Sequence, residues 1–376
     1  MNMDFLLNSP RQVIFGWGKA RELLPEKVKN FERLFILTGK TFASSGEFAE
    51  LSGTLKKAGK KMLHIAGIRM EAPLSEIENL LAAGREFKAE AVIAIGGGSI
   101  LDAGKTVAAL LPAEGSVEEY FYGKREVVRE GLPCLALPTT SGTGAEITTN
   151  AVLIDEKTGI KKSLRAPGMT PQIAICDPAL TVSCPRELTI HSGLDAFVQA
   201  FESCTSAKSS PYSKALAYEA LSLIVKNLPS AAENGRDKAA RSAMAQASLL
   251  TALAFTTTGL GAIHGLAHPI GSILHVPHGL ACALLIEEIV KWNLPAAEEE
   301  YGKMAQILSW GKSGEDFLNG AAAFVQSFRI GKGFGEWGLK REHFPFIIAN
   351  CRSASMKGNP RHLSDSDVET ILEKLL

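Results

Sequence analysis

Short apolar runs alternate with helical stretches over the first half of this 376-residue chain, and the alternation stops near residue 184. Amphipathic segments such as 75–89 separate several of these runs. Buried strands that alternate with helices are typical of a mostly parallel sheet covered on both faces. We therefore expect an α/β domain over residues 1–184. Its candidate strands are 13–16, 34–38, 62–66, 91–95, 134–138, 151–155 and 173–177.

Beyond residue 184 the strand-like runs almost vanish and helical periodicity takes over. The clearest helical segments are 213–228, 239–255, 279–293 and 367–376. The last has Ser366 before it and Glu369 three residues later, which is the pattern of a capping box. We place the domain boundary near Pro185 and expect residues 185–376 to form an all-helical domain.

The charge balance argues against two classes of partner. Forty basic and forty acidic residues cancel, so the sequence predicts neither nucleic acid nor an anionic membrane surface as a partner. The N-terminal residues lack the pattern of a signal peptide, and the chain has no run of 18 uncharged apolar residues. The six cysteines form no CxxC pair. These features predict a cytoplasmic protein with reduced thiols.

A glycine turn follows the apolar run 91–95. Gly97, Gly98 and Ser99 stand between this run and a helical segment whose first turn contains Asp102. Glycine allows close backbone approach to a diphosphate, and the first amides of the helix can donate to it. The stretch is not a complete GxGxxG, because Leu101 occupies the third glycine position. A tight turn without a ligand is the alternative.

A second polar loop follows the run 134–138 and contains Thr139, Thr140 and Thr143. Hydroxyls at the carboxyl ends of parallel strands lie where open sheets bind ligands. A turn stabilised by its own hydroxyl-to-backbone bonds is the alternative. Two such loops after strands of one sheet favour a nucleotide.

The helical half carries candidate metal ligands. Asp195 and Gln199 are four residues apart and so share one face of a helix, and His264 and His268 have the same spacing. His278 follows shortly after. Carboxylate oxygen and imidazole nitrogen suit a borderline divalent cation. The run HGLAH lacks the glutamate of HExxH, which argues against a metalloprotease. Hydrogen-bonded core histidines are the alternative.

The motifs taken together resemble the iron-containing (group III) alcohol dehydrogenase family, over nearly the whole chain and in order. The matching segments are GGGSILDAGK, PTTSGTGAE, GLDAFVQAFES, IHGLAHPIG, HVPHG and NPRHLSDSDVETIL. The resemblance implies a dehydroquinate synthase-like fold, with a dinucleotide-binding α/β domain, an all-helical metal domain and an active site in the cleft between them. It also implies NAD or NADP, usually Fe²⁺ and sometimes Zn²⁺, a small alcohol or aldehyde substrate, and a homo-oligomer, in this family a dimer.

The resemblance assigns roles residue by residue. It puts the cofactor diphosphate on Gly97, Gly98 and Ser99. Further cofactor contacts are implied at Asp102, Thr139, Thr140, Thr143 and Lys161. The implied metal ligands are Asp195, Gln199, His264 and His278, and His268 matches a catalytic position near the substrate.

Two positions depart from the family pattern. Most members have histidine at the position of Gln199, and an amide oxygen is a weaker ligand than imidazole for Fe²⁺ or Zn²⁺. Gly39 stands after the second strand, where many NAD-using members carry an aspartate for the ribose hydroxyl, and Lys40 follows it. Without a carboxylate to repel a 2′-phosphate, the sequence favours NADP over NAD.

The interpretation that results is a metal-dependent, NAD(P)-linked alcohol dehydrogenase or aldehyde reductase. A metal-independent oxo-acid reductase of the maleylacetate reductase type is one alternative, against which Asp195 argues. A dehydroquinate synthase-like lyase would need a denser set of basic residues. A non-catalytic nucleotide-binding protein with a degraded metal site is a further alternative, supported only by Gln199.

Overall fold

The computed structural model describes residues 3–127 and 131–376. The chain divides into two compact units. We call residues 8–185 with 235–245 the sheet unit, and residues 3–7, 186–234 and 246–376 the helical unit. The main division falls between Pro185 and Arg186, while the two short segments 3–7 and 235–245 group with the unit that is remote in sequence.

The sheet unit is built on a parallel sheet of six strands, in the order β1-β8-β5-β4-β2-β3. Its strands are β1 (Gln12–Phe15), β2 (Arg33–Thr38), β3 (Lys61–Ala66), β4 (Ala91–Gly96), β5 (Cys134–Pro138) and β8 (Ile173–Cys176). Each coincides with an expected strand to within a residue or so. This arrangement confirms the expected α/β class.

One expected strand does not join this sheet. The run 151–155 forms β6 (Asn150–Asp155), which pairs antiparallel with β7 (Ile160–Arg165) in a separate two-stranded hairpin. Buried and half-buried residues alternate along β6, as in a strand with one covered face, whereas every residue of β4 is buried. Placing 151–155 in the parallel sheet was therefore wrong, and β7 was not predicted because its residues are largely polar.

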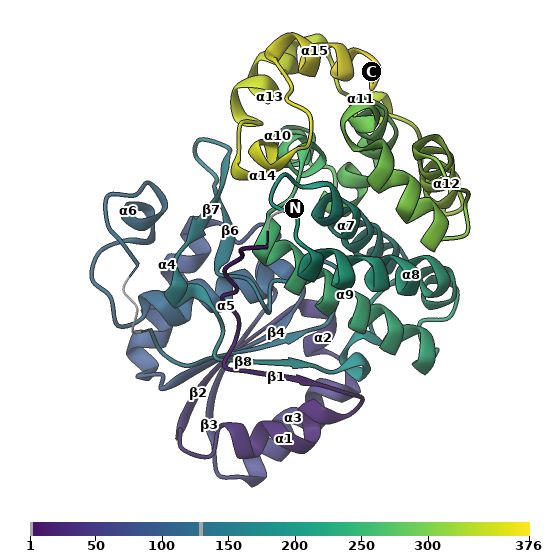
Figure 1. Cartoon of the computed structure of the whole chain (residues 1–376). Coiled ribbons are helices and arrows are strands. Elements are labelled where there is room, and N and C mark those ends of the chain that lie inside the picture. The colour runs from purple at the N-terminus through teal and green to yellow at the C-terminus, as the bar shows by residue number, and fades with distance from the viewer. Residues whose placement is uncertain (1–2, 128–130) are drawn as a thin grey trace. The chain divides into compact units, whose positions relative to one another are not determined.

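Helices cover both faces of the parallel sheet (Figure 1). Phe35 and Leu37 of β2 pack into a core with α4 and α5, and Leu34 and Ile36 pack into a second core with α1 and α3. Successive residues of a strand point to opposite faces, so a continuous apolar run supplies both cores. The helices are α1 (Lys19–Lys27), α2 (Lys40–Ala43), α3 (Gly46–Lys57), α4 (Leu74–Phe87), α5 (Gly98–Leu110) and α6 (Val117–Phe121), with 3₁₀ turns at Pro167–Met169 and Pro178–Thr181.

The helical unit contains no strand among its described residues, as expected. Its helices are α7 (Arg186–Thr205), α8 (Pro211–Glu233), most of α9 (Lys238–Thr258), α10 (Ala262–Leu274), α11 (His278–Ile307), α12 (Gly314–Gln326), α13 (Phe344–Asn350), α14 (Ala354–Gly358) and α15 (Asp365–Glu373), with 3₁₀ turns at Gly335–Trp337 and Arg341–His343. The cap of α15 differs from our expectation. Ser364, with Asp367, forms the capping box, because the helix begins two residues earlier than the pattern of Ser366 and Glu369 indicated.

Helix α7 is the centre of the helical unit. It packs against α8 and α11. Phe197 and Phe201 on one side of α7 join an aromatic cluster with Phe317 and Phe324. This apolar anchoring fixes the rotation of α7 and therefore the direction in which its polar side chains point.

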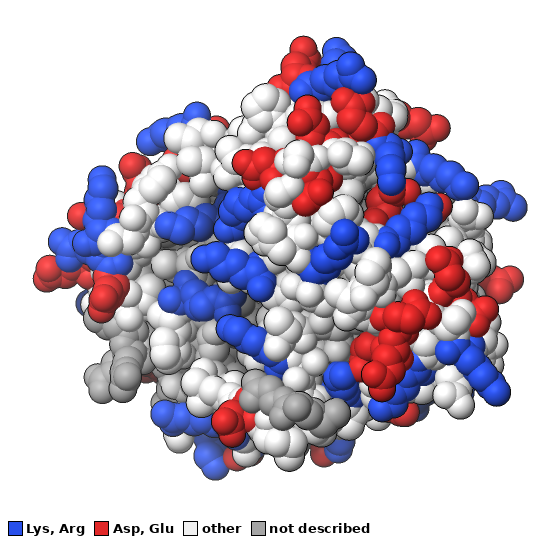
Figure 2. Space-filling model, turned by 45° about the horizontal axis from the view of Figure 1, so that its top comes forward, with Lys and Arg blue, Asp and Glu red and all other residues white. Residues whose placement is uncertain are grey.

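Two surface properties bear on possible partners. In the part of the chain that is described, no single helix is long and apolar enough to cross a membrane; α9 and α10 meet that test only when joined across a bend of 104°. Acidic and basic side chains both occur on the face shown in Figure 2, next to one another around its rim, and neither sign covers it.

Candidate metal centre and cofactor loops

Helix α7 presents two of the expected ligands from one buried face. Asp195 and Gln199 are 2% and 4% exposed. Glu202, one further turn along the same face, is buried as well. Polar side chains buried to this degree need partners or a bound ion.

Glu202 ties α7 to the beginning of α10. Its carboxylate accepts hydrogen bonds from the amides of Gly261, at 2.9 Å, and Ile263, at 2.8 Å. These are amides that a helix N-terminus leaves without intrahelical partners. Glu202 Oε2 also lies 2.6 Å from Nδ1 of His264. This bond assigns the ring proton to Nδ1 and directs Nε2 of His264 toward Asp195.

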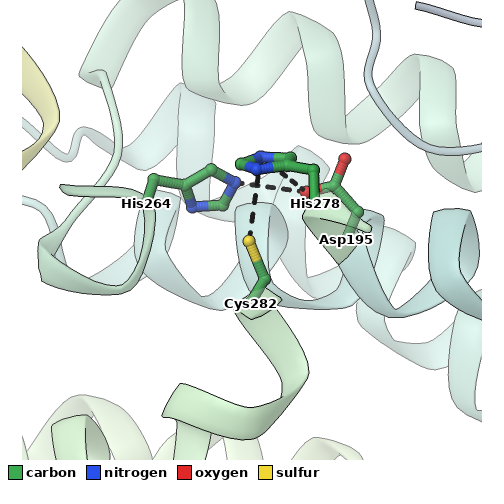
Figure 3. A group of neighbouring side chains, drawn as sticks. All are labelled: Asp195, His264, His278 and Cys282. Carbon is green, nitrogen blue, oxygen red and sulfur yellow. Dashed lines mark hydrogen bonds and ion pairs between the residues drawn. The ribbon is translucent and has the colours of Figure 1, made fainter. Parts of the chain in front are cut away.

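The first two turns of α11 add two more candidate metal ligands. Nε2 of His278 lies 3.7 Å from Oδ1 of Asp195 and 3.8 Å from the sulfur of Cys282, one turn further along α11. Nε2 of His264 lies 3.2 Å from the same carboxylate oxygen. Figure 3 shows the four side chains converging from α7, α10 and α11. One ligand atom from each lies within 4.8 Å of the others.

Gly279 allows this approach of α11 to α7. A Cβ at Gly279 would lie 2.0 Å from the carbonyl oxygen of His191 and 3.2 Å from Cβ of Asp195. Only a residue without a side chain fits at this contact. The position of His278 beside Asp195 thus depends on the glycine that follows it.

The charges in this group require a proton or a cation. When Nδ1–H of His264 donates to Glu202, Nε2 of His264 and Oδ1 of Asp195 are both acceptors unless something positive lies between them. Burial opposes a charge on His264, yet Cys282, Glu202 and Asp195 together raise its pKa well above the usual value. Burial also raises the pKa of the Cys282 thiol to about 11, with His264 acting in the opposite direction. A divalent cation would replace these protons.

Three other predicted or neighbouring residues lie as follows. Gln199 is buried near this face of α7, and its Oε1 has no hydrogen-bond partner among the described residues. The ring of His268 stacks on that of His278, with centroids 5.0 Å apart and 17° between the planes. His275 is exposed and ends α10 in a left-handed conformation, so it does not join the group.

Sequence reasoning missed Glu202, Cys282 and Asn359. Glu202 lies seven residues after Asp195, and Cys282 lies four after His278, so both spacings indicated a shared helix face. Asn359 belongs to the NPRH segment and accepts a hydrogen bond from the amide of Ala262, at the start of α10. Spacing along the chain does not predict that the faces of α7 and α11 that carry Glu202 and Cys282 meet.

In the sheet unit, the predicted cofactor loops lie side by side. Gly96 pairs with Pro138 across β4 and β5, and Thr38 pairs with Ile95 across β2 and β4. The segments that follow these three strands therefore share one edge of the sheet. The amide of Thr139 donates to the carbonyl of Gly96 at 3.0 Å, which joins the glycine turn to the threonine loop.

The glycines of the turn lie against threonines of the other loop. A Cβ at Gly97 would lie 3.3 Å from Thr140, and one at Gly98 would lie 2.9 Å from Thr143. Gly98 begins α5, so the first amides of this helix point out from the edge of the sheet. Gly104 takes the packing role of the missing third glycine, since its Cβ would lie 2.4 Å from that of Ala94 in β4.

Asp102 is bound by other residues of this chain. It is 8% exposed, accepts from the amide of Val152 at 2.8 Å, and pairs with the buried Lys105 at 2.8 Å. The bond from Val152 attaches α5 to β6 of the hairpin, while the pair with Lys105 lies within α5. Lys161 is paired with Glu71 at 2.7 Å, and Ser99 accepts from the amide of Glu71 at 3.0 Å. Ser99 and Lys161 are thus held in one network.

Gly39 begins the segment after β2 with extended backbone, at φ −72° and ψ 155°. A side chain there would meet nothing within 4 Å. Lys40 is exposed, and its aliphatic stem lies against Gly67, at the end of β3. This corner therefore has a basic side chain beside open space at Gly39.

Both halves of the chain match models of one protein family. A family model described as iron-containing alcohol dehydrogenase matches residues 10–178, and one described as the C-terminal part of that family matches residues 189–376. The chain is 33% identical to the sulfoacetaldehyde reductase of Bilophila wadsworthia, over 99% of each chain. It is 32% identical to long-chain-alcohol dehydrogenase 1 of Geobacillus thermodenitrificans, over 95% of this chain and 93% of that one.

Solved structures lead to the same conclusion. A 1,3-propanediol oxidoreductase has a TM-score of 0.92 at 27% identity and is covered completely, with 99% of this chain. The sulfoacetaldehyde reductase of Bifidobacterium kashiwanohense, solved with NAD⁺, has a TM-score of 0.90 at 28% identity, over 99% of its chain and all of this one. These matches define an oxidoreductase of the NAD(P)-dependent alcohol dehydrogenase and aldehyde reductase class. The chain belongs to the iron-containing alcohol dehydrogenase family.

Proposed function

We propose that this enzyme interconverts a small alcohol and its aldehyde with a divalent ion held by Asp195, His264 and His278, and with Gln199 adjacent to the ion. The observation that carries the proposal is the buried group of carboxylate and imidazole donors on three helices. The residues fit a divalent ion, because their lone pairs converge and Glu202 supports one imidazole from behind. When bound, the ion supplies a Lewis acid that polarises the substrate oxygen, and the nicotinamide gives or takes hydride.

His268 is the proposed catalytic residue near the substrate. Its ring stacks on His278 and is not a member of the converging donor group. Its place beside His278 suits the imidazole of His268 to orient the substrate oxygen or to carry its proton.

In the sheet unit, Gly97, Gly98 and Ser99 are proposed to hold the cofactor diphosphate with the first amides of α5. Thr139, Thr140 and Thr143 line the neighbouring loop. Asp102 and Lys161 support these segments through the pairs they form with Lys105 and Glu71. A backbone cradle at a helix N-terminus is the usual way in which such sheets bind a diphosphate.

The metal proposal is tested with the variant His264→Ala. Elemental analysis of protein purified without chelator, after loading with Fe²⁺ or Zn²⁺, should give one ion per wild-type chain and none in the variant. Most turnover of butanal or butanol should be lost with it. His362→Ala, at an exposed histidine, is the matched control and should change neither. Wild-type protein that never binds a stoichiometric ion would exclude the metal mechanism.

We further propose that NADP(H) is used at least as well as NAD(H). The corner at Gly39 has space for a 2′-phosphate, and Lys40 stands beside it to attract the added negative charge. Gly39→Asp should move the ratio of kcat/KM values toward NADH, because its carboxylate fits sterically and repels the phosphate. Lys40→Gln should weaken NADPH use alone. A wild-type preference for NADH above about tenfold, about 1.4 kcal/mol, would contradict this choice.

The family resemblance also leads us to propose a homodimer in the cytoplasm, with no nucleic acid or membrane as partner. The balanced charge of the chain supports the latter part. Light scattering on the purified enzyme should give twice the mass of 40.2 kDa, and a monomer at assay concentration would contradict the dimer.

A further inference from the structure

Cys282 lies within the metal-ligand group, although it was not predicted as a ligand. The side chain is fully buried, one turn after His278 on the same face of α11. Its sulfur is 3.8 Å from Nε2 of His278 and within 4.8 Å of the ligand atoms of Asp195 and His264. Figure 3 shows the sulfur turned toward the imidazoles.

Three separations among these ligand atoms are close to the edges of a coordination tetrahedron. With ion-to-nitrogen and ion-to-sulfur bonds of about 2.0–2.1 Å and 2.3 Å, tetrahedral ligands lie about 3.3 Å apart for two light atoms and about 3.6 Å for nitrogen and sulfur. The observed separations are 3.2 Å and 3.7 Å from Asp195 to the two imidazoles, and 3.8 Å from His278 to the sulfur. The other separations among the four ligand atoms are at most 4.8 Å.

Gln199 is the competing candidate for the fourth position. Its amide oxygen is neutral, and amide oxygen is a weaker ligand for a transition metal than thiolate or imidazole. A thiolate would also add a charged ligand. Together with Asp195 it supplies two negative charges to a divalent ion, in a site where His278 is the one ligand with substantial exposure.

We propose that the Cys282 thiolate is the fourth protein ligand, beside Asp195, His264 and His278, with a substrate oxygen as a fifth ligand, to which zinc sites can expand. The inference rests on the proposed metal-dependent function and specifies its ligand sphere. The thiol proton is released to solvent as the metal–sulfur bond forms. Because thiolate is a soft ligand, the set favours Zn²⁺ or Co²⁺ over Fe²⁺ more strongly than a set with oxygen in this position would.

Cobalt loading of the full-length enzyme tests the ligand without relying on turnover. A cysteine ligand gives bound Co²⁺ a thiolate-to-metal charge-transfer absorption in the near ultraviolet, which oxygen and nitrogen ligands do not give. Wild type should show this band at one Co²⁺ per chain, and Cys282→Ser should lose it. Cys204→Ser is the matched control, since Cys204 is equally buried on α7 but is not in the donor group, and it should retain the band.

Competition with a chromophoric zinc chelator gives the second measurement. Loss of a supporting partner behind a ligand weakens metal binding by about 10–100-fold, so Cys282→Ser should raise the Kd for Zn²⁺ by roughly 100-fold or more. The ratio of the Kd for Fe²⁺ to that for Zn²⁺ should fall in this variant. Cys204→Ser should match wild type in both.

The outcomes separate this inference from the proposed function. Wild type that binds one Co²⁺ without the charge-transfer band overturns the thiolate ligand, whatever the folding of the variants. The same holds when Cys282→Ser retains zinc affinity while Gln199→Ala loses it, and in both cases the metal-dependent function stands. Wild type that binds no metal at all overturns both proposals.

Discussion

Glu202 has three partners, all at the start of α10. Its two oxygens accept from the amides of Gly261 and Ile263 and hold Nδ1 of His264. The same carboxylate therefore caps α10, fixes its approach to α7 and selects the tautomer of the ligand. A carboxylate behind a ligating imidazole also raises the basicity of that ligand.

Glu202→Gln tests this role. The amide oxygen of glutamine still accepts one hydrogen bond, but the negative charge behind His264 is lost, so metal affinity should fall by about 10–100-fold. Chelator competition with Zn²⁺ measures the change. Glu300→Gln is a suitable control, because Glu300 pairs with Lys214 and Tyr218 elsewhere on the helices. Equal zinc affinity in wild type and Glu202→Gln would show that the carboxylate only caps the helix.

Spacing along the chain predicted the expected ligands one helix at a time. Asp195 and His264 were proposed because carboxylate and imidazole suit a divalent ion and because each had a candidate partner four residues away. The structure brings these two residues within 3.2 Å of each other. Cys282 was passed over because a single cysteine on an apolar helix is ordinarily part of the core. Which faces of α7, α10 and α11 meet depends on tertiary packing, and local periodicity carries no information on that.

At the scale of elements, the continuous apolar runs of β2, β4 and β5 predicted their burial on both faces and hence the parallel sheet. The hairpin of β6 and β7 was harder. The run 151–155 is as apolar as a sheet strand, and only the structure shows that alternate residues are less buried. The charged side chains of Lys161 and Lys162 made the sequence of β7 look like that of a loop. Antiparallel pairing across a short turn is a local alternative that hydrophobicity alone does not separate from a place in the sheet.

The contact between α7 and α11 gives a prediction at this scale. Gly279→Ala would put a Cβ 2.0 Å from the carbonyl oxygen of His191, so the start of α11 must move away from α7. We expect a loss of about 1–3 kcal/mol in unfolding free energy, the usual cost of overpacking. Metal binding should also weaken, because His278 moves with the helix. Urea unfolding and zinc titration measure the two effects.

Gly53→Ala is the control for that experiment. Gly53 lies inside α3, where an added Cβ meets nothing within 4 Å. Alanine is the better helix former, so this variant should keep or gain up to about 1 kcal/mol of stability. An unchanged zinc affinity in Gly279→Ala would mean that the spacing of the ligands tolerates movement of α11.

At the scale of the whole molecule, one buried acid should make the unfolding free energy of the enzyme depend on pH. Glu146 follows the threonine loop, is 3% exposed, and lies in the sheet unit. Burial raises its pKa to about 7, while its own backbone amide and Lys105 act in the opposite direction. The ordinary value is 4.5. Between pH 4.5 and about pH 7, native Glu146 therefore keeps a proton that the unfolded chain has released.

The sign of the pH dependence follows from this difference. Below pH 4.5 the carboxyl is protonated in both states, and its neutral form is accommodated in the fold. As the pH rises toward 7, the unfolded chain gains stability by ionising while native Glu146 does not, so the free energy of unfolding falls. A shift of this size corresponds to about 2 kcal/mol lost between pH 5 and pH 8.

Glu146→Gln should abolish that loss, because glutamine stays neutral at every pH. Urea unfolding at pH 5 and pH 8 gives the measurement, and the difference between wild type and variant cancels the titration of all other groups. Between pH 5 and pH 8 the unfolding free energy of the variant should rise by about 2 kcal/mol relative to that of wild type. Glu86→Gln, at an exposed position of α4, should follow wild type at both pH values. Parallel pH profiles for wild type and Glu146→Gln would show that Glu146 ionises in the native state as readily as it does in the unfolded chain.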